Sequence, residues 1–200
     1  MLSLYKNNMF TGIIEQLGEV VSVEKEGTNI HFTLKSSFTH ELKVDQSVAH
    51  DGCCLTVVKI SGDTYVVTAI DETLAKTNLN FWQVGKKINL ERCLLMNARF
   101  DGHIVQGHVD TTGICVGIED LDGSWKYTFS YSTNDVTVEK GSITVNGTSL
   151  TVVDSTQGSF SVCIIPYTYE HTNFHTFEIG TQVNLEFDII GKYVARLLGK

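Results

Sequence analysis

The chain contains the same unit twice, and this repeat limits what it can fold into more than any other feature. Shifted by 95 positions, residues 47–91 align without a gap on residues 142–186, with 15 identities in 45 pairs. The same register extends upstream, where it places Gly12 on Gly107 and Gly18 on Gly113. Identity over so long a span predicts two successive domains of one fold.

Each unit has the pattern of a small all-β domain. Runs rich in Val, Ile, Thr, Tyr and Phe are separated by turn residues at the spacing typical of barrels and sandwiches. About six short strands would leave unprotected edges in an open sheet, so closure into a barrel is favoured. The runs expected as strands in the first unit are 18–23, 30–34, 55–60, 65–70 and 88–90. Short helical turns are expected at 71–77 and 167–173, and apolar positions at helical spacing predict a terminal helix over 190–198, outside the repeat.

The composition excludes several classes of protein. A formal net charge of −8 argues against a nucleic-acid partner. No run reaches the roughly 20 apolar residues of a membrane helix, and residues 1–8 are too short and polar for a signal peptide. We therefore expect a cytoplasmic protein with no membrane partner. Five cysteines, two of them adjacent, fit reduced thiols better than a disulfide framework.

Positions where the two units differ in chemistry are candidates for a functional site. Cys54 aligns with Ser149, Ile13 with His108, and Asp45 with Lys140. A site built from two similar but unequal pockets would show such differences. Each residue also has an ordinary structural interpretation: Cys54 as a small buried apolar residue, Ser149 as a hydroxyl that satisfies the backbone, and His108 as a surface histidine.

Other kinds of site are less well supported. A metal pair of His103 and His108 lacks a third clustered ligand, and five residues apart on a strand the two would point to opposite faces. A hydrolase triad built on Ser149 lacks the Gly-x-Ser-x-Gly elbow, and there is no Gly-rich phosphate loop. From the residues alone the prediction is a duplicated small β-barrel with a polar ligand site.

Five segments, taken in order, resemble the riboflavin synthase family, and the resemblance covers the chain from Met9. The segments are Met9–Ile14, Ser47–Val57, Asp71–Leu79, Gly102–Asp110 and Val145–Val152. The resemblance implies an all-β fold of two tandem, similar six-stranded Greek-key β-barrels plus a short C-terminal α-helix. The boundaries expected from it and from the repeat are an N-terminal extension at 1–8, barrels at 9–97 and 104–189, and an oligomerisation helix at 190–200. The extension is expected to be poorly ordered.

The resemblance also implies a reaction. Two molecules of 6,7-dimethyl-8-ribityllumazine would be converted to riboflavin and 5-amino-6-ribitylamino-uracil by transfer of a four-carbon unit. The site would lie between the N-terminal barrel of one subunit and the C-terminal barrel of its neighbour in a homotrimer. No cofactor and no metal are implied. Besides the substrate, the partner expected is lumazine synthase, through functional coupling. Two similar pockets make sense because donor and acceptor are the same molecule.

The resemblance carries a set of site residues onto this chain. Ser149 and His108 are expected to assist proton transfer or hydroxyl addition in one pocket, with Cys54 orienting the lumazine or acting as a nucleophile in the other. The residues expected to bind substrate are Gly12, Ile13, Ile14, Ser47, Cys54, Leu55, Thr56, Thr68, Ala69, Ile70, Asp71, Glu72, Thr73, Gly107, His108, Val109, Lys140, Ser149, Leu150, Thr151, Ile164, Ile165, Pro166, Tyr167, Thr168, Tyr169 and Asp188.

The second unit departs from the family pattern in one segment. Tyr167-Thr168-Tyr169 stands where the family has Glu-Thr-Leu, and His171 where it has Arg or Lys. These changes are expected to alter affinity in the second pocket. The alternative functions are a non-catalytic lumazine- or flavin-binding protein of the same fold and, from a different class, a structural or transport barrel without turnover.

Overall fold

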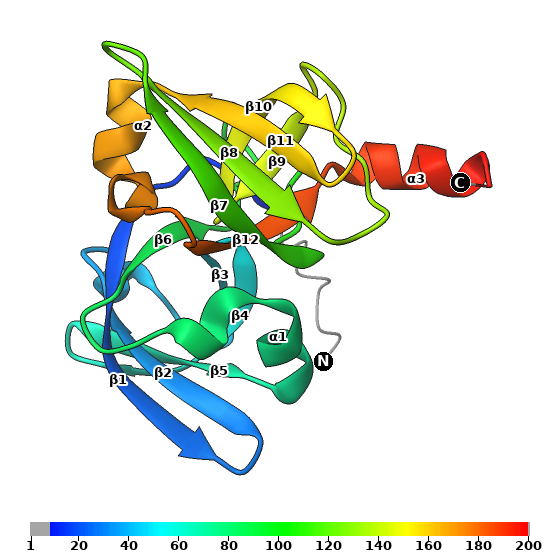
Figure 1. Ribbon diagram of the computed structural model, residues 1–200. Coiled ribbons are helices and arrows are strands. Elements are labelled where there is room, and N and C mark those ends of the chain that lie inside the picture. The colour runs from blue at the N-terminus through cyan, green and yellow to red at the C-terminus, as the bar shows by residue number, and fades with distance from the viewer. Residues whose placement is uncertain (1–8, 200) are drawn as a thin grey trace.

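The protein folds into two closed antiparallel β-barrels of six strands each, as the computed structural model of residues 9–199 shows (Figure 1). The strand order is β1-β2-β5-β4-β3-β6 in the first barrel and β10-β11-β8-β7-β12-β9 in the second. This confirms the predicted pair of barrels. The expectation for residues 1–8 lies outside the described residues.

The elements of the two barrels correspond in order, except that η1 of the first barrel has no counterpart among the elements of the second. In the first barrel they are β1 (Gln16–Glu26), β2 (Asn29–Lys35), η1 (Thr39–Glu41), β3 (Ser47–His50), β4 (Cys53–Ser61), β5 (Thr64–Ala69), α1 (Asp71–Lys76), η2 (Asn78–Phe81) and β6 (Lys87–Arg92). In the second they are β7 (Thr111–Asp120), β8 (Trp125–Tyr131), β9 (Ser142–Val145), β10 (Thr148–Thr156), β11 (Ser159–Ile164), α2 (Pro166–His171), η3 (Asn173–Thr176) and β12 (Gln182–Phe187). Helix α3 (Ile189–Leu197) follows and covers the helix predicted at 190–198 except for its last residue.

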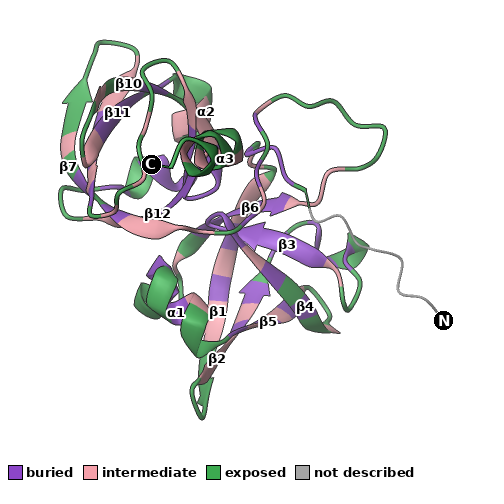
Figure 2. Cartoon of the chain, turned by 90° about the vertical axis from the view of Figure 1, so that its right-hand side faces the viewer, coloured by how far each residue is buried: buried purple, intermediate pink, exposed green. Residues whose placement is uncertain are grey.

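Each barrel has its own apolar core, because alternate residues of every strand point inward. The first core is built around Phe32, Leu34 and Trp82, and the second around Tyr127, Phe129 and Phe160. The short helices after β5 and β11 pack against these cores through Leu74 and Tyr169. Figure 2 shows buried residues concentrated where the barrels meet as well as inside them.

The barrels meet at an interface whose residues are related by the offset of 95. Gly52 and Gly147 lie against each other, and a Cβ on either would come within 2.7 Å of the other's backbone nitrogen. Both have positive φ angles, 78° and 77°. Only glycine fits here, because it needs no Cβ space and tolerates this backbone conformation. The local pseudo-twofold axis therefore passes between these two residues.

Buried amides surround this axis in matched pairs. The Asn78 N–H donates to Asn184 Oδ1 at 2.7 Å, and the equivalent Asn173 N–H donates to Asn89 Oδ1 at 2.8 Å. The side-chain amide of Asn184 donates to the Asp51 carbonyl at 2.9 Å, and that of Asn89 donates to the Asn146 carbonyl at 2.9 Å. The barrels are thus joined by hydrogen bonds that apolar residues could not replace without leaving buried backbone groups unpaired.

The pair Asp51 and Asn146 is a chemical difference between the halves at the axis. Asp51 Oδ1 accepts from the Asn89 N–H at 2.8 Å, just as Asn146 Oδ1 accepts from the Asn184 N–H at 2.8 Å. The second carboxyl oxygen of Asp51 is buried and has no hydrogen-bond partner among the described residues. Burial raises the pKa of Asp51 to about 7. Below that pH the carboxyl is mostly neutral, and it then resembles the amide on the other side.

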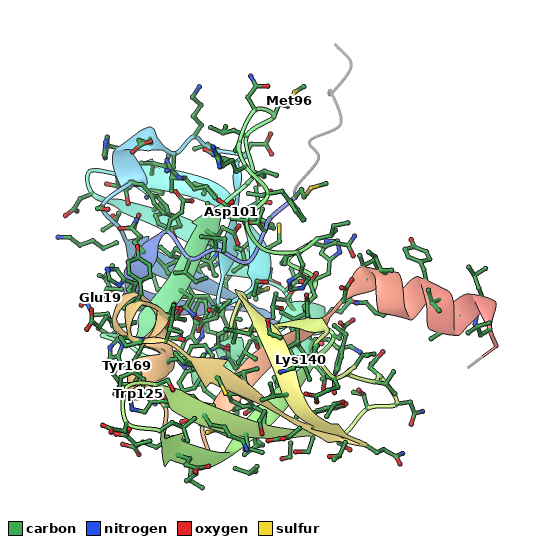
Figure 3. The ribbon with its side chains drawn as sticks, turned by 90° about the horizontal axis from the view of Figure 1, so that it is seen from above. Glu19, Met96, Asp101, Trp125, Lys140 and Tyr169 are labelled. Carbon is green, nitrogen blue, oxygen red and sulfur yellow. The ribbon has the colours of Figure 1, made fainter. Side chains whose placement is uncertain are left out.

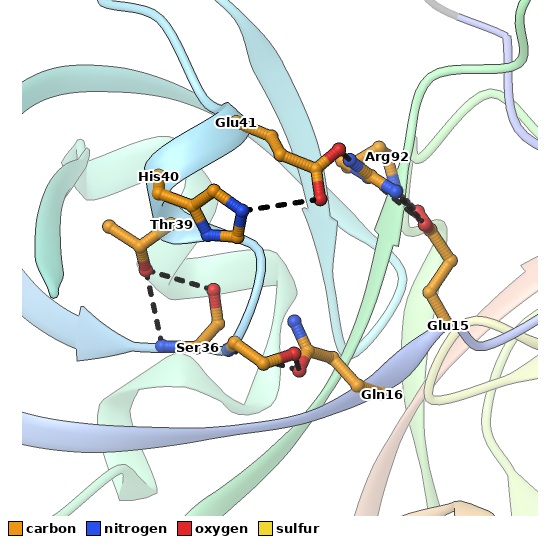
Figure 4. Close-up of polar contacts among 8 residues, drawn as sticks. Glu15, Gln16, Ser36, Thr39, His40, Glu41 and Arg92 are labelled. Carbon is orange, nitrogen blue, oxygen red and sulfur yellow. Dashed lines mark hydrogen bonds and ion pairs between the residues drawn. The ribbon is translucent and has the colours of Figure 1, made fainter.

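An ion-pair cluster fixes the chain where it enters the first barrel (Figure 4). Arg92, at the end of β6, contacts Glu15 at 2.6 Å and Glu41 at 2.7 Å. Its guanidinium also lies 4.8 Å from the centre of the Phe38 ring. The cluster joins η1 and β6 to the residues just before β1, and so supports the segment that leads into the site described below.

Helix α3 extends away from the second barrel (Figure 1) and is largely exposed (Figure 2). Its side chains Ile190, Tyr193, Val194 and Leu197 are each at least half exposed. Asp188 caps it, because its Oδ1 accepts from the Ile190 N–H at 3.0 Å. In the part of the chain that the structure describes, no helix is long and apolar enough to cross a membrane.

Candidate functional site

A short segment of each half crosses to the barrel of the other half. The segment before β1 pairs with the segment before β7 through a bridge between Phe10 and Val105. Past this bridge, the Ser149 N–H donates to the Gly12 carbonyl, and the Cys54 N–H donates to the Gly107 carbonyl, both at 2.8 Å. Each barrel therefore presents its Cys or Ser next to a segment from the other half.

The crossing segments lie so close to the barrels that glycine is required. A Cβ on Gly12 would lie 2.6 Å from the Ser149 Cβ, and one on Gly107 would lie 2.6 Å from the Cys54 Cβ. Both glycines also have positive φ angles, 79° and 74°. The glycine that the two repeats share, at 12 and 107, is thus required because two chain segments approach closely there, as well as for its backbone conformation.

Two buried glutamates hold the crossing segments. Glu91 accepts from the Thr11 N–H at 2.7 Å and the Gly12 N–H at 3.0 Å. The equivalent Glu186 accepts from the N–H groups of Gln106 at 2.7 Å and His108 at 2.9 Å. Burial raises the pKa of each carboxyl to about 7, and the backbone N–H groups oppose that rise. Because these oxygens are occupied by backbone donors, the glutamates act as anchors of the segments.

The first candidate pocket combines elements from both halves. The β4–β5 hairpin pairs Val57 with Val67, so the residues just before Val57 and just after Val67 lie at the same end of the barrel. Ser47 on β3 pairs with Thr56 on β4. The structure thus brings together one group of predicted residues: Ser47, Cys54, Leu55, Thr56, Thr68, Ala69, Ile70, Asp71, Glu72 and Thr73, with Gly107, His108 and Val109 from the crossing segment.

The second candidate pocket is the equivalent arrangement. Strands β10 and β11 pair Val152 with Val162, which places the following residues of β11 beside the preceding residues of β10. The group brought together is Ser149, Leu150, Thr151, Ile164, Ile165, Pro166, Tyr167, Thr168 and Tyr169, with Gly12, Ile13 and Ile14 from the crossing segment.

The crossing corrects the expectation that Ser149 and His108 share one pocket. His108 is exposed and follows Gly107, whose carbonyl binds the Cys54 N–H, so it belongs with Cys54. Ser149 lies instead beside Gly12 and Ile13. Its hydroxyl oxygen is 2.7 Å from Nδ1 of His103, a histidine that the sequence suggested only as one half of an unsupported metal pair. Each pocket thus has its own imidazole, from a different position in the chain.

Surroundings distinguish the two candidate reactive groups. The Cys54 thiol is half-buried, and burial raises its pKa while a hydrogen bond with Ser47 lowers it. A raised pKa disfavours the thiolate, which is the nucleophilic form. His103 is buried, and burial lowers its pKa, which keeps the imidazole beside Ser149 neutral. The two pockets therefore offer a thiol beside a hydroxyl and a hydroxyl beside a neutral imidazole.

One further predicted residue, Asp188, lines a cavity near α3, and another, Lys140, lies on a loop beside it. This cavity has a volume of 570 Å³ and is lined by residues 134–138 and 141–142, Asp188 and part of α3. Asp188 therefore faces a space large enough for a polar chain. Lys140, labelled in Figure 3, lies on the adjoining loop with a positive φ angle of 64° and is exposed. It does not line the cavity.

The departures from the family pattern form aromatic pairs beside the second pocket. Trp125 on β8 stacks on Tyr169 of α2 with ring centres 3.9 Å apart (Figure 3). The positions equivalent to these are Ile30 and Leu74 in the first barrel, which are aliphatic. Tyr167 stacks on His171 at 4.1 Å and is 69% exposed. The second pocket thus has a more aromatic rim than the first. Among residues 9–199 no group of three His, Cys, Asp or Glu side chains could hold a metal ion.

Sequence reasoning missed the residues that join the two halves. These are His103, the two anchoring glutamates and the buried amides around the axis. The signal was present for most of them: Asn78, Asn89 and Glu91 are identical to their partners at 173, 184 and 186. Polar residues kept identical inside apolar strands indicate a polar contact shared by both units. His103 has no such signal, because the offset pairs it with Asn8, outside the described residues.

Comparison with known proteins agrees with this architecture. The model of the lumazine binding domain matches twice, at residues 11–93 and 106–188, with the same offset of 95. The chain is 40% identical over 195 residues to riboflavin synthases of Actinobacillus pleuropneumoniae and Bacillus subtilis, which covers 96% of this chain and 91% of each relative. The chain belongs to the riboflavin synthase family. A family member from Saccharomyces cerevisiae is 34% identical over 203 residues, with 94% of this chain and 85% of the relative covered.

Solved structures share the fold. LumP complexed with 6,7-dimethyl-8-(1'-D-ribityl) lumazine superposes with a TM-score of 0.82 at 22% identity, covering 90% of this chain and 99% of that chain. LumP complexed with riboflavin gives the same TM-score and identity, with 89% and 98% covered. The two-barrel fold is therefore common to riboflavin synthases and to this ligand-binding protein.

Proposed function

We propose that this protein is a riboflavin synthase that binds one 6,7-dimethyl-8-ribityllumazine in each barrel and transfers a four-carbon unit between the two. The observation that carries the proposal is the pair of equivalent pockets with unequal chemistry, in a chain 40% identical to named riboflavin synthases. Equivalent pockets suit two copies of one substrate. Unequal groups, Cys54 with His108 and Ser149 with His103, suit a donor and an acceptor role.

The chemistry asks the protein for positioning and for help with proton transfer. The methyl group on C7 of the lumazine ring is acidified by the electron-poor ring, so a strong base is unnecessary. Hydroxyl, thiol and imidazole groups can move the proton and stabilise the anion that forms. The hydroxyls of Ser47, Thr56 and Thr151 and the Asp188 carboxylate suit the ribityl chains. The reaction yields riboflavin and 5-amino-6-ribitylamino-uracil.

We further propose that the reacting pockets face each other between subunits of a homotrimer. Within one chain, each pocket is completed by a crossing segment from the other half. In the proposed trimer, the first pocket of one subunit would face the second pocket of its neighbour. Helix α3, with apolar side chains exposed, is the element proposed to hold the subunits together.

One experiment tests the reaction. Purified protein is incubated with 6,7-dimethyl-8-ribityllumazine alone, and riboflavin is followed by its absorbance. Turnover is expected. Bound but unchanged lumazine would favour a non-catalytic lumazine-binding protein, a function that the fold shared with LumP supports. A chain that does not bind lumazine would contradict both functions.

A second experiment tests the site between subunits. His108→Gln damages the first pocket and Ser149→Ala the second, so each variant alone is expected to turn over slowly. After the two are mixed, unfolded and refolded together, about a quarter of the sites in randomly mixed trimers would combine two intact pockets. Recovery of activity towards that level is expected. No recovery above the separate variants would contradict a site shared between subunits.

A further inference from the structure

We infer that His103 is a positioning residue for Ser149: its Nδ1–H donates to the Ser149 hydroxyl oxygen and leaves the serine O–H directed as a donor into the second pocket. This inference rests on the proposed function, because it assigns a role within the proposed site. Three observations support it: the contact itself, the burial of the ring, and the crowding that fixes the segment.

The contact is short and enclosed. His103 Nδ1 lies 2.7 Å from Ser149 Oγ, within the range of a strong neutral hydrogen bond. The residue is 9% exposed, although it lies on an irregular segment where most neighbours alternate between buried and exposed. Among residues 9–199 the imidazole therefore has one polar partner, and that partner is the candidate reactive hydroxyl.

Burial decides which nitrogen of the His103 ring carries the proton. Nε2 is buried and has no hydrogen-bond partner among the described residues. A buried N–H without an acceptor is rarer and more costly than a buried lone pair without a donor. The favoured tautomer therefore carries its proton on Nδ1, where Ser149 Oγ accepts it. The serine O–H is then free to donate to a ligand.

The backbone holds this geometry in place. The His103 N–H donates to the Thr11 carbonyl at 3.1 Å. A Cβ on the preceding Gly102 would lie 1.9 Å from that same carbonyl oxygen and 3.2 Å from the Ser149 Cβ. Three segments, from both crossing regions and from β10, thus converge within van der Waals distance. His103 has little freedom to turn away from Ser149.

This arrangement separates the pockets chemically. A donor fixed beside the second pocket would stabilise negative charge on a lumazine bound there, where charge develops as the methyl proton leaves. The first pocket instead has the exposed His108 on its crossing segment. His103 lies in the segment between β6 and β7 and contacts Ser149, in the second pocket.

The test uses substitutions that differ in which imidazole nitrogen they imitate. Asn places its amide near the Nδ1 position, so His103→Asn is expected to retain most of the turnover. His103→Gln reaches the Nε2 position, and His103→Leu keeps only bulk. Both are expected to lower kcat about threefold to tenfold, the worth of one hydrogen bond, while KM changes less than about twofold. His40→Gln, at an exposed histidine of η1, serves as the matched control.

A double-mutant cycle separates positioning from a structural role. In a Ser149→Ala background, His103→Gln is expected to cause no further loss of kcat, because its target is gone. An unchanged loss in that background would overturn the inference, and so would a His103→Asn variant as slow as His103→Gln.

The position of the His103 proton can also be tested by NMR spectroscopy on the folded wild-type protein, without measuring turnover. With ¹⁵N-labelled histidine, His103 is expected to show its proton on Nδ1, and Ser149→Ala is expected to shift that signal. A proton on Nε2 would overturn the donor assignment, whether or not the protein makes riboflavin. If lumazine is bound and unchanged while the Nδ1 proton is seen, the proposed function fails and the contact stands.

Discussion

The two barrels share one scaffold and differ where they would touch a ligand. Around the axis, Gly52 matches Gly147, and Asn78 and Asn89 match Asn173 and Asn184. Asp51 stands where the other half has Asn146. At the pockets, the thiol of Cys54 corresponds to the hydroxyl of Ser149 in the aligned repeats. The imidazoles of His108 and His103 come from positions that the repeat does not relate. The comparison shows that duplication preserved what joins the halves, while the groups available for chemistry diverged.

The largest effect is expected at the axis, where the halves are equal. Gly52→Ala and Gly147→Ala each place a Cβ 2.7 Å from a backbone nitrogen of the other barrel, at a positive φ angle. Each should lower the free energy of unfolding by more than about 3 kcal/mol, by similar amounts. Denaturant unfolding measures this. The control is Gly62→Ala, which has a positive φ angle of 62° but open space around it, and should lose only about 1 kcal/mol. Unequal losses at the two axis positions would show that the symmetry is only geometric.

A smaller loss, in turnover, is expected from the pockets, where the halves are unequal. Ser149→Ala should lower kcat about tenfold to a hundredfold, because it removes a hydroxyl from the reacting site. Cys54→Ser keeps a polar group of similar size and should lower kcat only about threefold. Steady-state riboflavin formation measures both. Ser149→Ala and His108→Gln variants with near-wild-type turnover would contradict the assignment of these residues.

The pair Asp51 and Asn146 predicts a pH effect of intermediate size on stability. The pKa of Asp51 is raised in the folded protein to about 7, so its stabilising contribution is complete below the ordinary carboxyl pKa. That contribution is lost as the pH rises towards 7. Asp51→Asn should remove part of this loss and raise the stability at pH 8 by about 1–2 kcal/mol relative to wild type. Asn146→Asp should do the reverse.

Unfolding at pH 4 to 8 measures this effect. Part of the slope should remain in Asp51→Asn, because Glu91 and Glu186 also have raised pKa values of about 7. An identical pH dependence in wild type and Asp51→Asn would mean that Asp51 is ionised at neutral pH despite its burial.

The smallest effect is expected at the rim of the second pocket. Trp125→Ile with Tyr169→Leu gives the second barrel the aliphatic pair of the first. The stacked pair contributes about 0.5–1.5 kcal/mol beyond its buried area, so lumazine affinity of the second pocket should change less than about tenfold. Fluorescence titration measures it. A loss of all binding would indicate that these rings contact the ligand directly.

The sequence was sufficient for the repeat and for the barrels, because both depend on local patterns. Runs rich in β-branched and aromatic residues, bounded by turn residues, place strands such as β5 within a residue of the prediction, at 64–69 against the expected 65–70. The equivalent segments of the two pockets could also be paired by the offset.

The crossing of the segments could not be predicted, for a physical reason. It depends on contacts such as Gly12 with Ser149 and Gly107 with Cys54, which join residues more than 50 positions apart. An alignment of the two units does not say whether the segment before the first strand of a barrel contacts that barrel or the barrel of the other half. The placement of His108 with Ser149 was therefore wrong, and the role of His103 was invisible to a comparison of the two repeats.

The paired contacts at the axis also suggest how such a chain arose. Equivalent residues meet there in the way that two identical subunits meet across a twofold axis. A single ancestral unit could have paired with a second copy of itself, exchanging its first residues in the same way. Joining the copies head to tail then created a stretch that no single unit possessed. That stretch carries His103 to Ser149 of the second barrel, so the join itself added to one ligand site a group that neither barrel contains.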